Sequence, residues 1–444
     1  MNKISIIGLG FVGLPLACIL AGLNKKKLEI VGIDEKFINK TLTKEKYLSS
    51  FSNNLIDKKL KIQIRKAINN DNFTISNNLK DIKDSNVIVV SINFDFQNAK
   101  FEKTFSYLKT FFRDISLNIT SKTLIILETT IPPGTSEKVI YPQIEQILRK
   151  RKFKKKVLYA YSYERVMPGA KYYDSIVNIN RCYSGINNES AKACKNFLKS
   201  FINTKKYLLF KLERIKDCET SKILENSYRA VNIAFLDEWT TFANKIGVNL
   251  NKVIDGIKAR ATHNNIMRPG LGVGGYCLTK DPLFAKISSD YLFKIHTDFP
   301  LTLKSVKINK KMPLNSLQFL KKNMPRKKLN ILILGASYKQ DIGDIRSSPS
   351  IDLYKYLKRG GNSVTIYDPL ILQSQKAKFI TNNLPNLNNF EVIIFCVAHK
   401  TFNKLKLSKL PKKPHYFDLN MVLNNTNKIF MKQKKFKLKV LGDD

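Results

Sequence analysis

A glycine triplet near the start of the chain limits the possible folds more than any other feature. The segment IIGLGFVGLPLA places Gly8, Gly10 and Gly13 directly after a short apolar run and at the head of a helical stretch. In this arrangement the first glycine permits a tight turn, the second lets the backbone approach a pyrophosphate, and the third lets the helix pack closely on the strand. The phosphate would rest on the helix N-terminus. Glycine turns without a ligand are the alternative for the triplet alone.

Asp34 ends the next apolar run, about 20 residues further along the chain. A carboxylate at this place accepts hydrogen bonds from ribose hydroxyls and repels a 2′-phosphate, which favours NAD over NADP. We therefore predict NAD as the cofactor, bound by Gly8, Gly10, Phe11, Val12, Gly13 and Asp34.

Apolar runs alternate with helical stretches in two regions of the chain. In the first region the runs lie at residues 4–7, 28–33, 86–92, 123–127 and 157–161, which indicates βαβ units and a parallel sheet. A helical pattern without Pro or Gly follows from residue 216 to about residue 246 and indicates the spine of a separate helical domain. The second alternating region opens at Leu329, and its first strand ends in the single Gly335, so it lacks the pyrophosphate turn.

The predicted fold class is therefore α/β. We expect an N-terminal Rossmann domain over residues 1–210, a central helical domain over residues 211–315 and a C-terminal Rossmann-like domain over residues 316–444.

The chain carries 77 Lys and Arg against 35 Asp and Glu, a formal charge of +42. Such a charge attracts polyanions, but the lysines are spread along the whole chain, and the dense runs at residues 149–156 and 432–439 are short. We interpret them as solvated surface and predict no specific nucleic-acid partner.

The apolar stretches and the cysteines bear on the compartment. The longest apolar stretch, residues 11–23, is interrupted by Gly13 and Pro15, so we predict no membrane partner. Six widely separated cysteines without a CxxC pair indicate free thiols in a reducing compartment, and we expect a cytoplasmic protein without a metal site.

The segment RPGLGVGGYCLTKDP, residues 268–282, holds the first candidate catalytic group. Its four glycines predict a flexible loop whose amides can close on an anion, and Cys277 follows them with Lys280 and Asp281 close by. A thiol beside exposed amides and a cation is placed to act as a nucleophile. A structural cysteine is the alternative, and the other five cysteines are interpreted as structural.

Polar groups also gather on the long helix and at two strand ends. Lys222, Asn226 and Arg229 stand at i, i+4 and i+7 and share a helix face that could hold an oxyanion or a water, although a solvated polar face has the same pattern. Two further pairs follow apolar runs where parallel sheets bind ligands, with turn chemistry as the alternative; they are Thr129 with Thr130, and Glu164 with Arg165.

Taken together and in order, six motifs resemble the UDP-glucose/GDP-mannose dehydrogenase family. They are GLGFVG, ETTIPPGT, YERVMPG, SKILENSYRAVNIA, GVGGYCLTKDP and GASYKQDIGDIRSSPS, and the resemblance runs from about residue 3 to about residue 420. It implies an NAD-dependent oxidation, in two rounds, of the C6 hydroxyl of a nucleotide-linked sugar to a carboxylate. Cys277 would capture the aldehyde as a thiohemiacetal and then carry the acyl group as a thioester. The resemblance also implies a homodimer formed through the long central helix.

The resemblance implies roles for individual residues. Lys222 would stabilise the oxyanion, Asn226 would orient the substrate oxygen, Asp281 would handle water and thiol protons, Thr130 would position a water, and Glu164 would act in acid/base chemistry or hydrolysis. Thr130 and Arg346 would also contact the cofactor. The expected substrate-binding residues are Glu164, Arg165, Lys222, Asn226, Arg229, Arg268, Gly274 and Lys339, with Arg260 as a further candidate.

Departures from the family pattern bear on the sugar. Pro168 stands where glucose-specific relatives carry a second carboxylate, which resembles the UDP-N-acetylhexosamine enzymes. We therefore expect UDP-N-acetylmannosamine or UDP-N-acetylglucosamine as the substrate, used for surface polysaccharide, with UDP-glucose as the alternative sugar. Tyr276 replaces a common histidine, and the segment after Ile92 lacks the usual Thr-Pro turn. A non-catalytic nucleotide-sugar binding protein is the alternative of another class.

Overall fold

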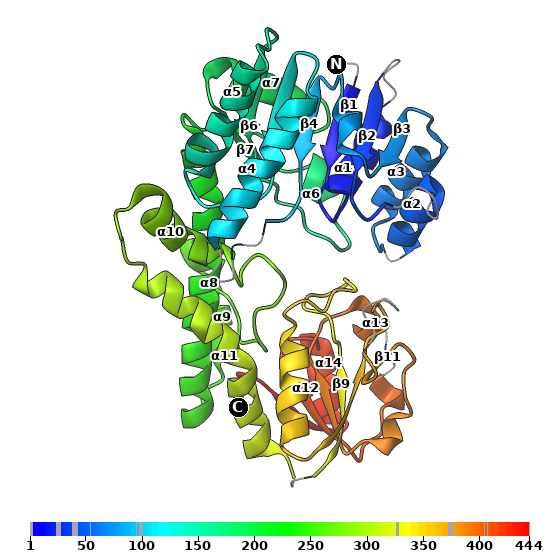
Figure 1. The fold of residues 1–444 in the computed structure, drawn as a ribbon. Coiled ribbons are helices and arrows are strands. Elements are labelled where there is room, and N and C mark those ends of the chain that lie inside the picture. Colours follow the sequence, from blue (N-terminus) through cyan, green and yellow to red (C-terminus); the bar gives the residue numbers. More distant parts are fainter. Residues whose placement is uncertain are drawn as a thin grey trace. The chain divides into compact units, whose positions relative to one another are not determined.

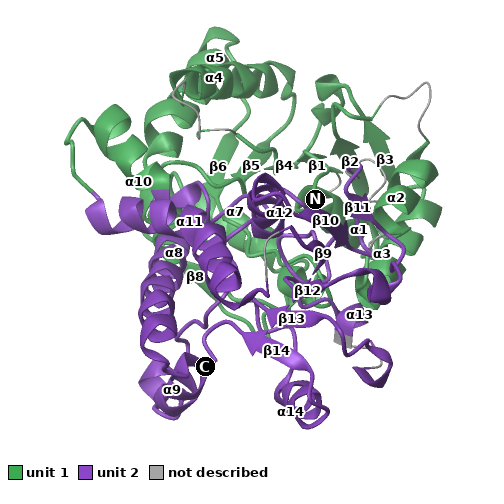
Figure 2. Cartoon of the chain, turned by 90° about the horizontal axis from the view of Figure 1, so that it is seen from below, with its two compact units in different colours: residues 1–225, 283–298 green, residues 226–282, 299–444 purple. Residues whose placement is uncertain are grey.

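The chain folds into two compact units. The computed structural model describes residues 3–23, 28–37, 43–53, 55–94, 96, 101–325, 328–371, 377–403, 405 and 407–443. Unit 1 comprises residues 1–225 and 283–298, and unit 2 comprises residues 226–282 and 299–444 (Figure 2).

Unit 1 is built on a sheet with the strand order β3-β2-β1-β4-β5-β6-β7-β8 among the described residues. Neighbouring strands pair in parallel except β6 with β7. Runs such as VIVV in β4 are buried at every position, as expected where helices cover both faces of a parallel sheet. The strands are β1 (Lys3–Ile7), β2 (Glu29–Ile33), β3 (Phe73–Ser76), β4 (Val87–Val90), β5 (Thr123–Leu127), β6 (Val157–Tyr161), β7 (Arg181–Gly185) and β8 (Leu209–Lys211).

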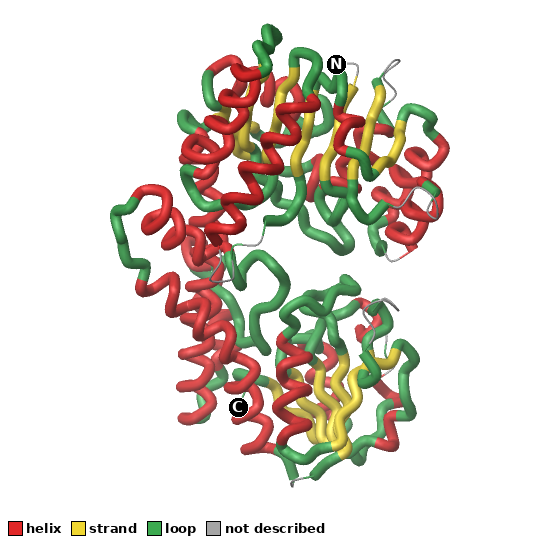
Figure 3. The backbone as a smooth tube through the Cα atoms, in the orientation of Figure 1, coloured by secondary structure: helices red, strands yellow, loops and turns green. Residues whose placement is uncertain are grey.

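Helices lie against both faces of this sheet (Figure 3). One apolar core joins the sheet to α1, α3 and α7, and a second core joins it to α4, α5, the start of α8 and α10. The helices of unit 1 are α1 (Gly13–Ala21), α2 (Lys44–Asn53), α3 (Lys58–Asn69), α4 (Phe101–Asn118), α5 (Tyr141–Lys150), α6 (Asp174–Val177), α7 (Asn188–Leu198) and α10 (Phe284–Ile287), together with the first part of α8 (Ile215–Ile246). The predicted long helix is thus confirmed as α8.

Residues 283–298 return to unit 1 after the chain has already entered unit 2. Phe284 is fully buried, with its ring centroid 5.3 Å from that of Phe96. Tyr291 stacks on Phe105 of α4, with 4.8 Å between ring centroids. This short segment is therefore part of the core of unit 1.

Unit 2 contains a parallel sheet with the order β11-β10-β9-β12-β13-β14 among the described residues. Six strands of unit 1 follow the same order, 3-2-1-4-5-6, which is the order of a Rossmann fold. The strands are β9 (Asn330–Leu334), β10 (Ser363–Tyr367), β11 (Ile380–Thr381), β12 (Val392–Phe395), β13 (His415–Asp418) and β14 (Lys437–Val440). Its helices, besides the rest of α8, are α9 (Leu250–Lys258), α11 (Pro300–Asn323), α12 (Pro349–Arg359), α13 (Lys400–Asn403) and α14 (Asn425–Gln433) (Figure 1).

The predicted α/β class and both Rossmann-type sheets are confirmed. The two predicted domain boundaries, after residues 210 and 315, remain a prediction, and the compact units divide the chain inside α8. Across the described residues, no helix is both long enough and apolar enough to cross a bilayer.

Candidate active site

The three glycines after β1 differ in the space around them. Gly8 has φ +91°, and a Cβ there would lie 2.7 Å from Cγ2 of Ile92. At Gly13, the first residue of α1, an added Cβ would lie 2.0 Å from the carbonyl oxygen of Gly8. Around Gly10, by contrast, the described structure leaves open space to 4 Å. This pattern fits the predicted roles of the three glycines, in which Gly10 is the one that lets the backbone approach a ligand.

Asp34 follows β2 and braces the glycine turn. One carboxylate oxygen accepts from the backbone N–H of Leu9 at 2.8 Å, and the other accepts from that of Lys36 at 2.9 Å. The side chain stays partly exposed, and Phe11 beside it is 39% exposed. An open backbone, a helix N-terminus and an accessible carboxylate fit a dinucleotide, so these residues would hold NAD.

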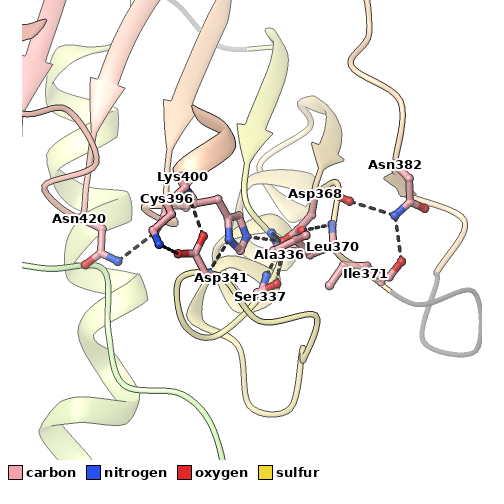
Figure 4. A network of polar contacts seen from close by, with 11 residues as sticks. Ala336, Ser337, Asp341, Asp368, Leu370, Ile371, Asn382, Cys396, Lys400 and Asn420 are labelled. Atoms are coloured by element: carbon pink, nitrogen blue, oxygen red, sulfur yellow. Dashed lines mark hydrogen bonds and ion pairs between the residues drawn. The ribbon is translucent and has the colours of Figure 1, made fainter. Parts of the chain in front are cut away.

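The corresponding turn in unit 2 is closely packed, and Figure 4 shows the polar contacts of Ala336, Ser337 and Asp368 beside it. Gly335 follows β9 with φ +105°, and a Cβ there would lie 2.4 Å from Cβ of Val397. Asp368, which follows β10, is fully buried and accepts from the N–H groups of Ala336 and Ser337 and from His399 Nε2. Its hydrogen bonds are made within the protein, which agrees with the predicted loss of the pyrophosphate turn in the second sheet.

The ends of β5 and β6 in unit 1 carry predicted catalytic groups. Thr129 donates to the carbonyl of Ile92 at 2.5 Å, and Thr130 beside it is partly buried. Lys222 of α8 is buried and donates to the backbone carbonyl of Glu164 at 3.0 Å, with its ammonium 5.4 Å from the ring centroid of Tyr163. The structure therefore brings Lys222 to Glu164, as the prediction of a shared site requires.

Arg165, a predicted substrate-binding residue, is engaged inside unit 1. Its Nη2 donates to the carboxylate of Glu225 at 2.8 Å, and its Nη1 donates to the carbonyl of Asn180 at 2.8 Å. These bonds orient the loop after β6, and the direct contact with substrate remains a prediction.

Sequence reasoning missed a buried ion pair between Glu128 and Arg181 in unit 1. The two side chains are 1% and 3% exposed. The carboxylate also accepts from Ser91 Oγ at 3.1 Å, and burial raises the pKa of Glu128. The pair joins the end of β5 to β7. The glutamate that opens the ETTIPPGT motif was the available signal.

Cys277 is exposed, and the other five cysteines are buried, which agrees with their interpretation as structural residues. The carbonyl of Cys277 accepts from the N–H groups of Lys280 at 3.1 Å and Asp281 at 2.9 Å. The fully buried Asp281 carboxylate accepts from Lys280 Nζ at 2.8 Å and from Asn226 Nδ2 at 2.7 Å. Unit 2 thus gathers Asn226, Lys280 and Asp281 in one hydrogen-bonded cluster next to the thiol-bearing residue.

The glycine loop before Cys277 packs closely against its surroundings, and its flexibility remains a prediction. A Cβ on Gly274 would lie 2.6 Å from Cβ of Tyr338, and one on Gly275 would lie 2.5 Å from the Tyr338 ring. The N–H of Gly275 donates to the carbonyl of Arg346 at 2.9 Å. The glycines let the loop pack tightly on the segment that follows β9.

The Tyr276 ring lies near two cations of unit 2. Lys280 Nζ is 4.3 Å from its ring centroid, and the guanidinium carbon of Arg346 is 6.0 Å from it. Arg346 also forms an ion pair with the buried Asp344 at 2.6 Å, which raises the pKa of Arg346. The residue predicted to be unusual therefore braces the cysteine loop.

The remaining predicted cations divide into two kinds. Lys339 is exposed at its surface, yet partial desolvation and the nearby charge of Arg229 lower its pKa, so the two cations lie in the same part of unit 2. Arg268, in contrast, forms an ion pair with Asp255 and donates to the carbonyl of Asn251. Arg260 is exposed.

Three domain profiles of the UDP-glucose/GDP-mannose dehydrogenase family match: the NAD binding domain at residues 2–202, the central domain at residues 216–311 and the UDP binding domain at residues 332–425.

Whole-chain relatives carry related names. A UDP-N-acetyl-D-mannosamine dehydrogenase of Methanococcus vannielii is 30% identical over 460 residues, covering 100% of this chain and 97% of the relative. A UDP-N-acetyl-D-glucosamine 6-dehydrogenase of Pseudomonas aeruginosa is 26% identical, covering 95% of this chain and 97% of the relative. The solved structure of a UDP-D-ManNAc dehydrogenase from Pyrococcus horikoshii has the same fold, with a TM-score of 0.77 at 24% identity over 99% of both chains. On the strength of its three matching domains and its full-length relatives, the chain belongs to the UDP-glucose/GDP-mannose dehydrogenase family.

Proposed function

We propose that this NAD-dependent nucleotide-sugar dehydrogenase oxidises the C6 hydroxyl of a UDP-N-acetyl sugar, of the mannosamine or glucosamine type, to the uronic acid. The observation that carries the reaction is the exposed Cys277 beside the buried cluster of Asn226, Lys280 and Asp281. Pro168 and the names of the full-length relatives support an N-acetylated sugar.

Bound NAD supplies a hydride acceptor in each of two rounds. In the first round C6 loses a hydride and its hydroxyl loses a proton, which gives an aldehyde. The Cys277 thiolate then adds to the aldehyde carbon as a thiohemiacetal. The second hydride loss leaves a thioester, and water releases the carboxylate and restores the thiol. Four electrons leave the sugar, so two NAD molecules are reduced for each sugar.

The surrounding side chains support these steps by charge and position. The buried ammonium of Lys222 stabilises negative charge on the C6 oxygen, and Asn226 donates to it. Asp281 moves protons of the thiol and water, Thr130 positions the water, and Glu164 acts in hydrolysis. Lys222 donates to the backbone carbonyl of Glu164, so the two residues are in contact within the proposed active site.

The UDP moiety is proposed to bind through cations of unit 2. Lys339 and Arg229 are close enough for Arg229 to lower the pKa of Lys339, an arrangement that a diphosphate would neutralise. Arg346, which forms an ion pair with Asp344, is proposed to contact the cofactor.

A second copy of the chain is the proposed partner of α8. Tyr228, Phe235, Trp239, Phe242 and Ile246 are each about half exposed. Their spacing of seven, four, three and four residues puts them on one helix face, typical of helices that pack together. In sedimentation or light scattering the wild-type chain should be a dimer, and Trp239→Glu combined with Phe242→Glu should give a monomer. A wild-type monomer would contradict the proposal.

The six cysteines form no disulfide with one another, which fits a reducing compartment and supports a cytoplasmic location. There the uronic acid product would enter the synthesis of surface polysaccharide.

The test is the amount of NADH formed per sugar, measured with UDP-glucose, UDP-N-acetylglucosamine, UDP-N-acetylmannosamine and GDP-mannose. Two NADH per sugar with one N-acetylated substrate is expected. A preference for UDP-glucose would overturn the sugar, one NADH would overturn the thioester step, and no NADH would favour a non-catalytic binding protein.

A further inference from the structure

Glu219 is a buried carboxylate that the proposed chemistry does not use. It lies on α8 in unit 1 and has no exposed surface. One oxygen accepts from the backbone N–H of Gly134, and the other accepts from that of Ser136 at 2.9 Å. Burial raises its pKa to about 8, although the hydrogen bonds from Ser136 and Gly134 oppose that rise. Burying a carboxyl group costs free energy unless the group is hydrogen-bonded, and both oxygens of Glu219 are.

Its two partners belong to the turn that carries Thr130. The turn runs from the end of β5 to a π-helical turn at Ser136–Ile140, a type of distortion that often accompanies functional sites. Glu219 therefore accepts hydrogen bonds from the N–H groups at the start of this helical turn, which would otherwise lack partners within the helix.

The same turn is held by residues 283–298 of unit 1. Ser288 Oγ donates to the carbonyl of Pro133 at 2.5 Å. Gly134 has φ +88°, and a Cβ there would lie 2.6 Å from the Phe293 ring. With the aromatic ring and the carboxylate both against it, the turn has little freedom to move.

Helix α8 links this turn to the predicted oxyanion group. Glu219 and Lys222 are three residues apart, so their side chains leave neighbouring places on one helix face. Glu219 reaches the turn after β5, and Lys222 reaches the carbonyl of Glu164 after β6. One rigid helix thereby fixes the ends of two adjacent strands.

We propose that Glu219 is a positioning residue for the dehydrogenation, because its carboxylate holds the Thr130 turn at a fixed place relative to Lys222. The inference rests on the proposed function for the roles of Thr130 and Lys222. Only a group with two acceptor atoms satisfies both N–H groups. A glutamine would turn its own NH₂ toward one of them and leave it unpaired.

The test compares Glu219→Gln with Glu137→Gln. Glu137 lies in the same π-helical turn, but its carboxylate is partly exposed and pairs with Lys216 at 3.3 Å, so its variant removes a charge nearby without touching the two N–H groups. Amide hydrogen exchange of Gly134 and Ser136 is measured together with kcat and with KM for the UDP sugar.

For Glu219→Gln we expect exchange at both amides to rise about tenfold or more and kcat to fall about tenfold, as for a buried N–H group that loses its hydrogen-bond acceptor. KM for the sugar should stay within about twofold, since the proposed diphosphate cations Lys339 and Arg229 are untouched. Glu137→Gln should match the wild type in exchange, kcat and KM. If Glu219→Gln does not fold, Glu219→Asp replaces it, with raised exchange and an intermediate kcat expected.

If amide exchange at Gly134 and Ser136 is unchanged in Glu219→Gln, Glu219 does not hold the Thr130 turn. If exchange rises but kcat stays at the wild-type value, Glu219 holds the turn but is not a positioning residue for the reaction. A failure of the proposed function is distinguishable, because it would appear as a wild-type chain that forms no NADH with any sugar. The exchange measurement would still decide whether Glu219 holds the turn.

Discussion

Replacement of Gly10 by alanine separates cofactor binding from stability at a single position. No atom of the described structure lies within 4 Å of a Cβ built on Gly10, and its φ is not positive. Alanine therefore fits the unliganded backbone without strain. The new methyl group would nevertheless occupy the space through which a pyrophosphate is predicted to approach.

The two effects have opposite signs. A glycine-to-alanine change at a compatible position stabilises a protein by about 0.4 to 1 kcal/mol, chiefly because the unfolded chain has fewer conformations. For a unit of this size the melting temperature should rise by about 1 to 4 °C. An extra methyl group in a packed contact costs about 1 to 3 kcal/mol. This corresponds to an NAD affinity lower by about 5- to 150-fold.

The assay is thermal melting by circular dichroism, followed by calorimetric titration with NAD. Gly13→Ala serves as the contrast, because its Cβ would lie 2.0 Å from the Gly8 carbonyl oxygen and must lower the melting temperature. If Gly10→Ala binds NAD as tightly as the wild type, the pyrophosphate does not approach Gly10, and the assignment of the glycine turn is wrong.

Three further predictions concern unit 2. Cys277→Ser should abolish acid formation while NAD binding by calorimetry stays unchanged, and a fully active variant would remove the thioester mechanism. Tyr276→Leu should slow alkylation of Cys277 by iodoacetamide several-fold, because it removes a contact between the ring and Lys280 that is worth about 0.5 to 2 kcal/mol. Tyr276→Phe keeps the ring, so its Cys277 should be alkylated at the wild-type rate. Equal alkylation rates for the two variants would contradict this role of the ring. Burial raises the pKa of Asp237 to about 6, so its contribution to stability is lost as pH rises from about 4 through 6. Asp237→Asn should therefore be more stable than the wild type by about 1 to 2 kcal/mol at pH 8 and nearly equal to it at pH 4, and equal melting temperatures at pH 8 would refute the effect.

The central strands of both sheets could be predicted because their residues are apolar on both faces. The run VIVV of β4 has no exposed position, and no helix or loop explains such a run better. The glycine turn could also be predicted, because each of its three glycines meets a different steric requirement.

Two strands that carry charged residues, β7 and β14, were not predicted. The sequence RCYSG of β7 contains Arg181, whose charge is neutralised by Glu128 from a distant part of the chain. The lysine run near the C-terminus was interpreted as solvated surface, and Lys437 and Lys439 are indeed exposed, but the strand β14 to which they belong was not predicted. Lysine suits this position because β14 is an edge strand.

Pairs of distant residues were also beyond the sequence. The contacts of Asp281 with Asn226 and of Glu219 with Gly134 join residues 55 and 85 positions apart, and no local pattern encodes such pairs. The cysteine loop was expected to be flexible because glycine frees the backbone, but the same residues also allow close packing, which is how Tyr338 uses them.

The return of residues 283–298 to unit 1 has a consequence for synthesis on the ribosome. When residue 225 has been made, the core of unit 1 still lacks Phe284. Residues 226–298 take about 4 to 15 s more at 5 to 20 residues per second. Through that interval an apolar site on the nascent chain remains uncovered, and the first unit cannot finish folding before part of the second has emerged. The order of translation and the order of folding therefore cannot coincide in this protein.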